Sequence, residues 1–478
     1  AALRTDWPVS ATAPATARLR LVSESTGLTS DMSAPIFVYD LSIIEPSATV
    51  VRIGEPMDVR WVAGSPSDVV RVDLGVYDVD GVWSEMTTAG SLPSARSDHS
   101  SVWISYMGLN RLFVFGGRDA GGNAIADGWS YKPADESQPN ASSEWTALPL
   151  SGQPSARWNA ASGALNSGFI IWGGTNGVDL LNDGAVYHAE WKQWLPMSMA
   201  DAPVGRSGFA SIVNEHSQLI VWGGIDQGGT YLNSGSIYSG GAWFEINAVG
   251  APSARVGASI AYADTKIYVF GGYDEGGAYL ADGGVYDMTT WEWTPISSVG
   301  GPAGRRDAEI AFYAGELFIF GGRDGSGAVA DGAVYDFASG IWSPISGVNA
   351  PTTCGGSVRI GSVWHIFGDG RIADGARYDL IAGVWSPVSA ANAPSDRSGY
   401  SVAYDPRGSV WLFGGNDGGV ALNDGASYRP NGFTRLTSIS GATYDSGLIS
   451  QYDTRGRKPG ESYRTRVRDA NRQDAYRI

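Results

Sequence analysis

The feature that most constrains this chain is a unit of about fifty residues that recurs along its length. The unit is easiest to follow around residues 316–346. Residues 317–320 form a continuous apolar run, which is typical of a strand buried on both faces. Gly321 and Gly322 end this run, and a pair of glycines indicates positive φ angles or a very close neighbour. Three further runs complete a predicted four-stranded unit: residues 308–313, 333–336 and 341–345.

Every unit carries the same landmarks in the same order. The first is a double glycine, at Gly116-Gly117, Gly173-Gly174, Gly223-Gly224, Gly271-Gly272, Gly321-Gly322 and Gly414-Gly415, with Gly368-Asp369 as a degenerate seventh. A tyrosine follows, at Tyr131, Tyr187, Tyr238, Tyr286, Tyr335, Tyr378 and Tyr428. A tryptophan comes next, at Trp145, Trp194, Trp243, Trp293, Trp342 and Trp385, and Phe433 stands at the seventh place.

A Pro-x-x-Arg sequence opens most units. The pairs are Pro93/Arg96, Pro154/Arg157, Pro203/Arg206, Pro252/Arg255, Pro302/Arg305 and Pro394/Arg397. In the sixth unit Pro351 is followed by Cys354 where the arginine is expected, and the loop after Gly368 is shorter. Arg371 in this short loop is predicted to restore the missing cation, and ordinary divergence between repeats is the alternative.

These landmarks resemble the kelch repeat, whose period is near fifty residues. The resemblance covers residues 78–440, about three quarters of the chain. It implies an all-β fold, a seven-bladed β-propeller of the type found in the central domain of galactose oxidase. The sequence leaves open how the ring closes, because both Trp83 and residues 433–439 offer the last outer strand.

Composition agrees with an all-β chain, since 66 of the 478 residues are glycine and no long amphipathic helix is evident. The net charge of −16 argues against general affinity for nucleic acid. One cysteine excludes an internal disulfide framework, and no apolar stretch is long enough for a membrane span. The chain begins with Ala1 and an Ala/Thr/Pro-rich stretch, so a processed, exported polypeptide is predicted, placed outside the cell or at its surface.

The segments beside the repeats alternate polar and apolar residues, as half-buried strands do. Residues 1–40 resemble the terminal strands of an incomplete immunoglobulin-like or fibronectin type III-like module. Residues 41–77 resemble the first half of a second sandwich, and residues 441–478 are predicted to complete it. The propeller would then be inserted in, or flanked by, an immunoglobulin-like domain. Two unrelated β appendages are the alternative.

The candidate binding residues lie on the loops that follow the double glycines and on the linkers that carry the arginines. In a kelch propeller both belong to one face. A ligand-binding or partner-binding site is predicted there from Arg96, Arg157, Trp158, Arg206, Arg255, Arg305, Arg371 and Arg397. Arginine forks form strong bidentate contacts with anions, and Trp158 could stack on a sugar or contact a partner. The alternative is that each arginine pairs with an acid or carbonyl of its own loop.

Metal chemistry is expected to be absent. Galactose oxidase, a kelch relative, needs two histidines and two tyrosines for copper, whereas His99, His188, His216 and His365 fall on different units here. No hydrolase or phosphate-binding motif occurs. Aspartates before glycine could bind calcium, although turn chemistry explains them equally. They are Asp127, Asp183, Asp282, Asp331, Asp374 and Asp424.

The sequence therefore predicts an exported, non-enzymatic binding or structural protein, such as a bacterial surface, adhesion or appendage component with protein partners. The open strands of residues 1–40 suggest head-to-tail filament assembly by strand addition, or completion by the rest of a longer polypeptide. A lectin-like propeller that binds carbohydrate and a galactose-oxidase-like enzyme are the alternatives. The ligand and the organism are not evident from the residues.

Overall fold

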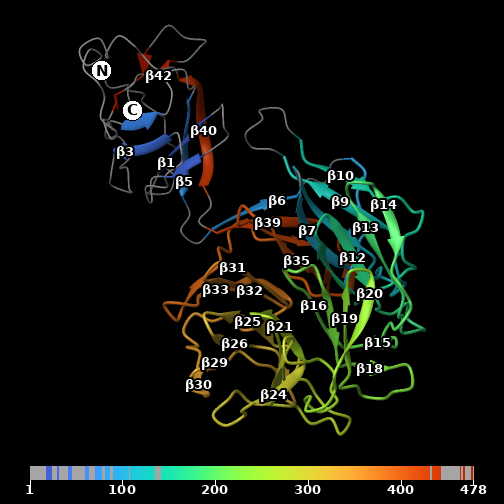
Figure 1. Ribbon diagram of the computed structural model, residues 1–478. Coiled ribbons are helices and arrows are strands. Elements are labelled where there is room, and N and C mark those ends of the chain that lie inside the picture. The colour runs from blue at the N-terminus through green and yellow to red at the C-terminus, as the bar shows by residue number, and fades with distance from the viewer. Residues whose placement is uncertain are drawn as a thin grey trace. The chain divides into compact units, whose positions relative to one another are not determined.

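The computed structural model describes residues 81–86, 90–106, 108–134 and 142–430 in full. Elsewhere it describes the backbone of the strands named below. All regular structure in these residues is β-strand (Figure 1). The chain divides into two compact units. The larger comprises Trp83–Asp135 and Ala141–Arg429, and the smaller contains both ends of the chain.

The larger unit contains seven four-stranded antiparallel sheets, which are the predicted blades. Blade one is β7 (Ser100–Tyr106), β8 (Leu109–Phe115), β9 (Gly128–Lys132) and β10 (Glu144–Ala147). Blade two is β11 (Ala161–Leu165), β12 (Gly168–Trp172), β13 (Gly184–His188) and β14 (Gln193–Pro196). Blade three is β16 (Ala210–Val213), β17 (Leu219–Trp222), β19 (Gly235–Ser239) and β20 (Ala242–Ile246).

Three further blades repeat this order. Blade four is β21 (Ser259–Ala263), β22 (Lys266–Phe270), β23 (Gly283–Asp287) and β24 (Glu292–Ile296). Blade five is β25 (Glu309–Tyr313), β26 (Glu316–Phe320), β29 (Gly332–Asp336) and β30 (Ile341–Pro344). Blade six is β31 (Gly356–Ile360), β32 (Val363–Gly368), β33 (Arg371–Asp379) and β34 (Val384–Pro387).

Blade seven combines distant parts of the chain. Its strands are β35 (Ser401–Tyr404), β36 (Val410–Phe413), β39 (Gly425–Arg429) and, as the outer strand, β6 (Val82–Glu85). Trp83 in β6 donates its indole N–H to Ser389 O at 2.8 Å. Trp83 therefore takes the seventh tryptophan place, and Phe433 does not, because the strand that holds Phe433 pairs in the smaller unit.

The seven blades form a closed ring. The first strands of successive blades contact each other in the order β7, β11, β16, β21, β25, β31 and β35, and β35 contacts β7 again. Short two-strand ladders in the loops are β15 (Arg206–Ser207) with β18 (Ile225–Asp226), β27 (Arg323–Asp324) with β28 (Gly327–Ala328), and β37 (Asn416–Asp417) with β38 (Val420–Ala421). The predicted seven-bladed kelch-type propeller is confirmed.

The core lies between the blades. The second strand of each blade is buried on both faces, as its apolar run predicts. Residues 317–320, for example, are at most 2% exposed. Each apolar cluster combines residues of two neighbouring blades, such as Phe320 and Trp385, whose ring centroids lie 4.8 Å apart. Several blade tryptophans also bond the preceding linker: Trp293 donates to Asn247 O at 2.7 Å and Trp342 to Ser297 O, whereas Trp194 Nε1 has no hydrogen-bond partner among the described residues. Blade packing therefore explains most of the recurring aromatic residues.

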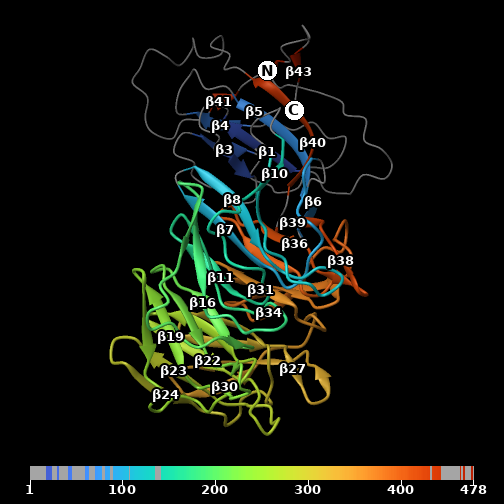
Figure 2. The same cartoon turned by 90° about the vertical axis from the view of Figure 1, so that its right-hand side faces the viewer.

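The smaller unit pairs strands from both sides of the propeller sequence (Figure 2). One sheet has the order β2 (Thr29–Asp31), β1 (Arg18–Ser23), β5 (Val70–Tyr77) and β40 (Phe433–Ala442). A second contains β3 (Leu41–Glu45), β4 (Arg60–Ala63) and β41 (Tyr463–Arg464). A hairpin joins β42 (Val467–Arg468) and β43 (Ala475–Tyr476).

This pairing differs from the predicted boundaries in two places. Strand β1 pairs with β5 along six residues, so the strand expected to be open within residues 1–40 has partners on both sides in its own chain. Strand β40 crosses the expected boundary at residue 440, because it pairs with β5 instead of continuing a blade. The immunoglobulin-like character of this unit stays a prediction.

Candidate functional site

The loop face of the propeller consists of the linkers that carry the arginines and the loops that follow the double glycines. The residue after each arginine pairs with the residue after each glycine pair. The pairs are Ser97 with Arg118, Trp158 with Thr175, Ser207 with Ile225, Val256 with Tyr273, Arg306 with Arg323, and Ser398 with Asn416. The two kinds of loop therefore share one face, as expected.

The linker arginines themselves are closed off from solvent. Arg96, Arg157, Arg206, Arg255, Arg305 and Arg397 are each at most 2% exposed. Arg157 shows the shared pattern: it donates to Ser155 O at 2.9 Å and to Gly173 O and Asp183 O, both at 3.0 Å. Its terminal nitrogen also lies 2.9 Å from a carboxylate oxygen of Asp183. The guanidinium thus ties the linker to the glycine pair and to the Asp-Gly turn of the same blade.

This geometry argues against the predicted ligand contacts of the six arginines. Their donors are occupied by carbonyl and carboxylate oxygens, and a ligand would have to break these buried bonds. Desolvation by burial lowers the pKa of Arg96, while Asp127 beside it acts in the opposite direction. The same pairs account for the Asp-Gly steps, whose carboxylates are engaged by arginine at Asp127, Asp183, Asp282, Asp331 and Asp424.

Blade three lacks the acid. Ser234 stands at the position of the aspartate, and Arg206 donates to its carbonyl at 2.9 Å and to its hydroxyl at 3.5 Å. Burial lowers the pKa of Arg206 to about 10. The arginine keeps its place without a bidentate carboxylate, so its carbonyl contacts are the shared element of the motif.

The double glycines allow neighbouring blades to touch through their backbones. Gly271 and Gly272 have φ angles of 70° and 100°. A Cβ on Gly271 would lie 2.5 Å from Arg305 O in the next blade, and Gly272 N donates to that same oxygen at 2.8 Å. Both expectations for the pair, positive φ and close approach, are confirmed.

A second turn position, two residues after each arginine, was not among the features expected from the sequence. Its members adopt the left-handed conformation, with φ of 50–70°: Asp98, Asn159, Gly208, Gly257, Asp307 and Gly399. Asp98 N donates to Gly399 O at 2.8 Å, and Asp307 N to Gly257 O at 2.8 Å, which links neighbouring blades. The signal was an Arg-x-(Asp/Asn/Gly) pattern, since these three residue types adopt this conformation most readily.

Blade six departs from the pattern because its linker is shorter. The chain runs from Pro351 to the paired Gly356 in five residues, whereas it takes seven from Pro93 to Ser100. The Asp374 carboxylate accepts a hydrogen bond from Thr352 at 2.5 Å and lies 3.6 Å from Arg371. Thr352 thus engages the carboxylate from the linker, as the arginine does in other blades. The Arg371 side chain is 66% exposed and adds only a long surface ion pair.

The thiol that replaces the arginine in sequence packs inward. A Cβ on Gly321 would meet the sulfur of Cys354. Burial raises the pKa of the Cys354 thiol, and Glu309 beside it adds to that rise. A protonated thiol is a poor nucleophile, so this cysteine has no sign of a reactive role.

Trp158 lies half-buried on the loop face. Its backbone pairs with Thr175, and a Cβ on Gly177 would lie 2.8 Å from the indole ring. The Cη2 end of the ring is therefore in contact with the loop of its own blade. Stacking on a sugar would be limited to what remains exposed.

A larger group of side chains gathers over blades three to five. Tyr273 lies 6.0 Å from Tyr231 and 6.2 Å from Tyr279, measured between ring centroids. The Arg306 guanidinium lies over the Tyr273 ring at 5.7 Å. Arg323 is backbone-paired with Arg306 and bonds Asp369 of blade six at 2.8 Å. We call these five residues the tyrosine–arginine patch: Tyr231, Tyr273, Tyr279, Arg306 and Arg323.

The patch is accessible. The side chains of Arg306 and Arg323 are 37% and 48% exposed. Desolvation raises the pKa of Tyr231, and Tyr273 beside it contributes to the same shift. Asp307 pairs with Arg306 at 2.7 Å, so each arginine already has one carboxylate neighbour. The patch therefore offers aromatic rings and partly free guanidinium donors, and Asp274 and Glu275 add negative charge beside Tyr231.

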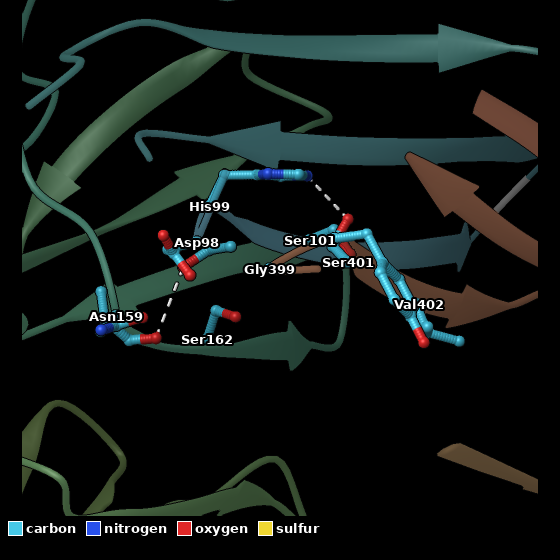
Figure 3. Close-up of a pocket in the computed structure, with 11 residues that line it drawn as sticks. Asp98, His99, Ser101, Asn159, Ser162, Gly399, Ser401 and Val402 are labelled. Carbon is cyan, nitrogen blue, oxygen red and sulfur yellow. Dashed lines mark hydrogen bonds between the residues drawn. The ribbon is translucent and has the colours of Figure 1, made fainter. Parts of the chain in front are cut away.

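A cavity of about 320 Å³ lies beside the first strands of blades one, two and seven (Figure 3). Its polar lining comprises Asp98, His99, Ser100, Ser101, Asn159, Ser162 and Ser401. His99 Nε2 lies 2.7 Å from Ser401 Oγ. Burial lowers the pKa of His99 to about 3, and Arg96 adds to the shift. The ring is therefore neutral, and its Nδ1 has no hydrogen-bond partner to orient it.

This serine–histidine pair does not have the arrangement of a catalytic pair. A general base works best when its pKa lies near the operating pH, and it is usually oriented by an acid. Here the pair joins blade one to blade seven, where Gly415 N also donates to Arg96 O at 2.8 Å. It therefore contributes to ring closure.

No group of three or more His, Cys, Asp and Glu side chains that could hold a metal ion occurs among the described residues. The four histidines lie in blades one, two, three and six, as expected. The loop acids accept hydrogen bonds from their own backbones, as Asp274 does from Ala278 N at 2.9 Å. Within the part of the chain that is described, no helix has the length and apolar character to cross a membrane.

Comparison with known proteins agrees with the fold. The KLHDC2/KLHL20/DRC7 Kelch-repeats domain matches residues 62–239 and 237–415. The chain belongs to the kelch-repeat family. Kelch repeats generally mediate protein interactions.

Individual relatives are similar over a limited part. Adagio-like protein 3 of Oryza sativa subsp. japonica is 28% identical over 190 residues, 37% of this chain and 28% of the relative. Adagio protein 3 of Arabidopsis thaliana is 28% identical over 186 residues, 37% of this chain and 29% of the relative. Beta-scruin of Limulus polyphemus is 25% identical over 154 residues, 30% of this chain and 15% of the relative. The matches thus span less than a third of each relative.

Proposed function

We propose that this protein is a binding module that holds a protein partner on the loop face of its propeller. The observation that carries the proposal is the tyrosine–arginine patch. Tyrosine and arginine are enriched among the residues that dominate protein–protein binding energy. A tyrosine ring buries a large area at a small entropic cost, and an arginine fork supplies several donors in a fixed plane. Membership in the kelch-repeat family supports the same conclusion.

The local charges define the kind of contact. Arg306 and Arg323 keep exposed donors, although Asp307 and Asp369 balance their charge. A partner that offers backbone carbonyls, a planar side chain or a single carboxylate fits these groups better than a strongly acidic surface would. Rings at Tyr231, Tyr273 and Tyr279 supply the apolar contact area. The linker arginines hold the loops in place and do not touch the partner.

The remaining expectations on function stay predictions. They are the exported or surface location, adhesion, and the absence of enzymatic activity. Head-to-tail filament assembly also stays a prediction, and the pairing of β1 with β5 in the same chain gives it less support. Carbohydrate binding has weaker support than protein binding, because the Trp158 ring is half-buried and its Cη2 end lies against Gly177.

The proposal is tested by affinity capture with the full chain from extracts of its source cells and their medium. The double variant Tyr273→Ala/Arg323→Ala should lose the proteins that the wild type retains, and purified candidates should then bind at least tenfold more weakly. Trp291→Ala is the matched control. Trp291 is 52% exposed, but it lies in the turn before β24, at the opposite ends of the strands. Equal capture by all three proteins would refute the proposal.

A further inference from the structure

The outer strand of each blade has one edge that no other strand of its sheet covers. Such an edge presents backbone N–H and C=O groups that can pair with another chain. Proline protects an edge when it stands where the N–H would point outward, because proline has no N–H. The outer strands of this propeller are not equally protected.

The register shows which N–H groups point outward. The third residue after a blade tryptophan bonds the neighbouring strand: Met197 N, Ile345 N and Val388 N each donate inward at 2.9 Å. Successive residues of a strand direct their N–H groups to opposite sides. The second residue after the tryptophan therefore directs its N–H away from the sheet.

Four blades have proline at this outward position. They are Pro196 in β14, Pro295 in β24, Pro344 in β30 and Pro387 in β34. In blade one, Leu148 N bonds inward to Gly128 O, and Pro149 takes the next outward position. In blade three the equivalent residue is Glu245, opposite Ser236, and Asn247 follows at the next outward position. Among the described outer strands, β20 is one of three without proline at the second position after the tryptophan. The others are β10, with Ala147 there, and β6, where Met86 N bonds inward to Gly425 O and Glu85 takes the outward position.

A shallow hollow lies where β20 ends. Its volume is about 540 Å³, and it is lined by Glu245, Asn247, Ala248 and Val249. Val249 is 78% exposed and Phe244 is 50% exposed, so two apolar side chains flank the free edge. Strand β20 is the outer strand of its sheet (Figure 1). Backbone donors, a hollow and apolar side chains thus occur together at this edge.

Charge decides between a second copy and a different partner. If two copies paired antiparallel about the outward position 245, Glu245 would face Glu245, and like charges directly opposite each other destabilise a sheet. The whole chain also has a net charge of −16, which opposes close approach of two copies. A lysine or arginine opposite Glu245 would instead form a favourable cross-strand pair.

We propose that β20 is a docking edge for an extended, proline-free segment of another protein. The segment adds a fifth antiparallel strand to blade three, places a basic residue opposite Glu245, and packs apolar residues on Phe244 and Val249. This edge is separate from the tyrosine–arginine patch. Loss of binding at β20 would therefore leave partner binding on the loop face unchanged. Loss of partner binding on the loop face would likewise leave binding at β20 unchanged.

The test uses the full chain and a defined probe, an acetylated and amidated heptapeptide of alternating valine and lysine. Calorimetry should show one peptide bound per chain. Hydrogen exchange should show protection of residues 242–247 when the peptide is added. A heptapeptide of alternating valine and glutamate should not bind. Absence of binding by the lysine peptide, or protection elsewhere only, would overturn the proposal.

Glu245→Pro is the decisive variant, because four other blades already hold proline at this position. It should lower the affinity for the lysine peptide at least tenfold while the variant stays folded. Glu245→Thr keeps the N–H and loses the charge, so it should retain protection of the edge and lose the preference for lysine over glutamate. Unchanged affinity in Glu245→Pro contradicts the proposal. If the wild type forms a dimer and Glu245→Pro abolishes it, the partner at this edge is a second copy of the chain, which contradicts the proposal of a segment from another protein. If Glu245→Pro does not fold, the exchange pattern and the Glu245→Thr comparison decide.

Discussion

Replacing Arg255 should cost much more stability than replacing its acidic partner. Arg255 is fully buried and donates to Ser253 O at 2.8 Å, Gly271 O at 3.1 Å and Asp282 O at 3.2 Å. Arg255→Met leaves these three acceptors without their donor. At about 1 kcal/mol for each orphaned group, plus the lost charged contact, the free energy of unfolding should fall by about 3–5 kcal/mol.

The matched variant is Asp282→Ser. The Asp282 side chain is 47% exposed, so its ion pair is screened by solvent and should contribute about 0–1 kcal/mol. Blade three already contains this arrangement, since Ser234 faces Arg206 there. Asp282→Ser should therefore lower the free energy of unfolding by no more than about 1 kcal/mol.

The assay is equilibrium urea unfolding of the full chain, followed by tryptophan fluorescence, which the buried blade tryptophans dominate. The m-value should be unchanged, so the shift of the midpoint reports stability directly. Arg371→Met provides a control, because this arginine is 66% exposed. Its replacement should change the free energy of unfolding by less than about 0.5 kcal/mol. Equal losses for Arg255→Met and Asp282→Ser would refute the view that the carbonyl contacts are the main element of the motif.

Two further predictions concern single residues. Gly272→Ala should destabilise the propeller by about 2–4 kcal/mol, because φ is +100° and the new Cβ would lie 2.8 Å from Val256 O. Gly277→Ala is the control, because φ is +79° there and nothing lies within 4 Å of the new Cβ. It should lower the free energy of unfolding by about 1 kcal/mol in the same urea assay. Burial lowers the pKa of His365 to about 3, so its contribution to stability is complete above the unfolded pKa of about 6.5 and is lost as the pH falls toward 3. His365→Phe should reduce the loss of stability between pH 7 and pH 5 by about 2 kcal/mol, and an unchanged pH dependence would contradict the neutral, buried state of this ring.

The repeating unit and the number of blades follow from the order of residues alone. An apolar run followed by two glycines can be recognised without tertiary information, because strand burial and positive φ leave their mark on residue type. The same local logic would also have identified Asp98 and Asn159, had the pattern after each arginine been considered. Positions set by backbone conformation are readable from the chain alone.

Features that depend on burial and on the choice of strand partner become visible only in the folded ring. Exposed and buried arginines look alike in a sequence, so the closure of Arg157 and its equivalents could not be read from Pro-x-x-Arg. Trp83 and Phe433 were equal candidates for the last outer strand, because strand pairing joins residues more than three hundred positions apart. The tyrosine–arginine patch and the open edge of β20 likewise arise from three blades side by side and from register. Local sequence carries conformational preference, whereas solvent access and long-range pairing are properties of the closed ring.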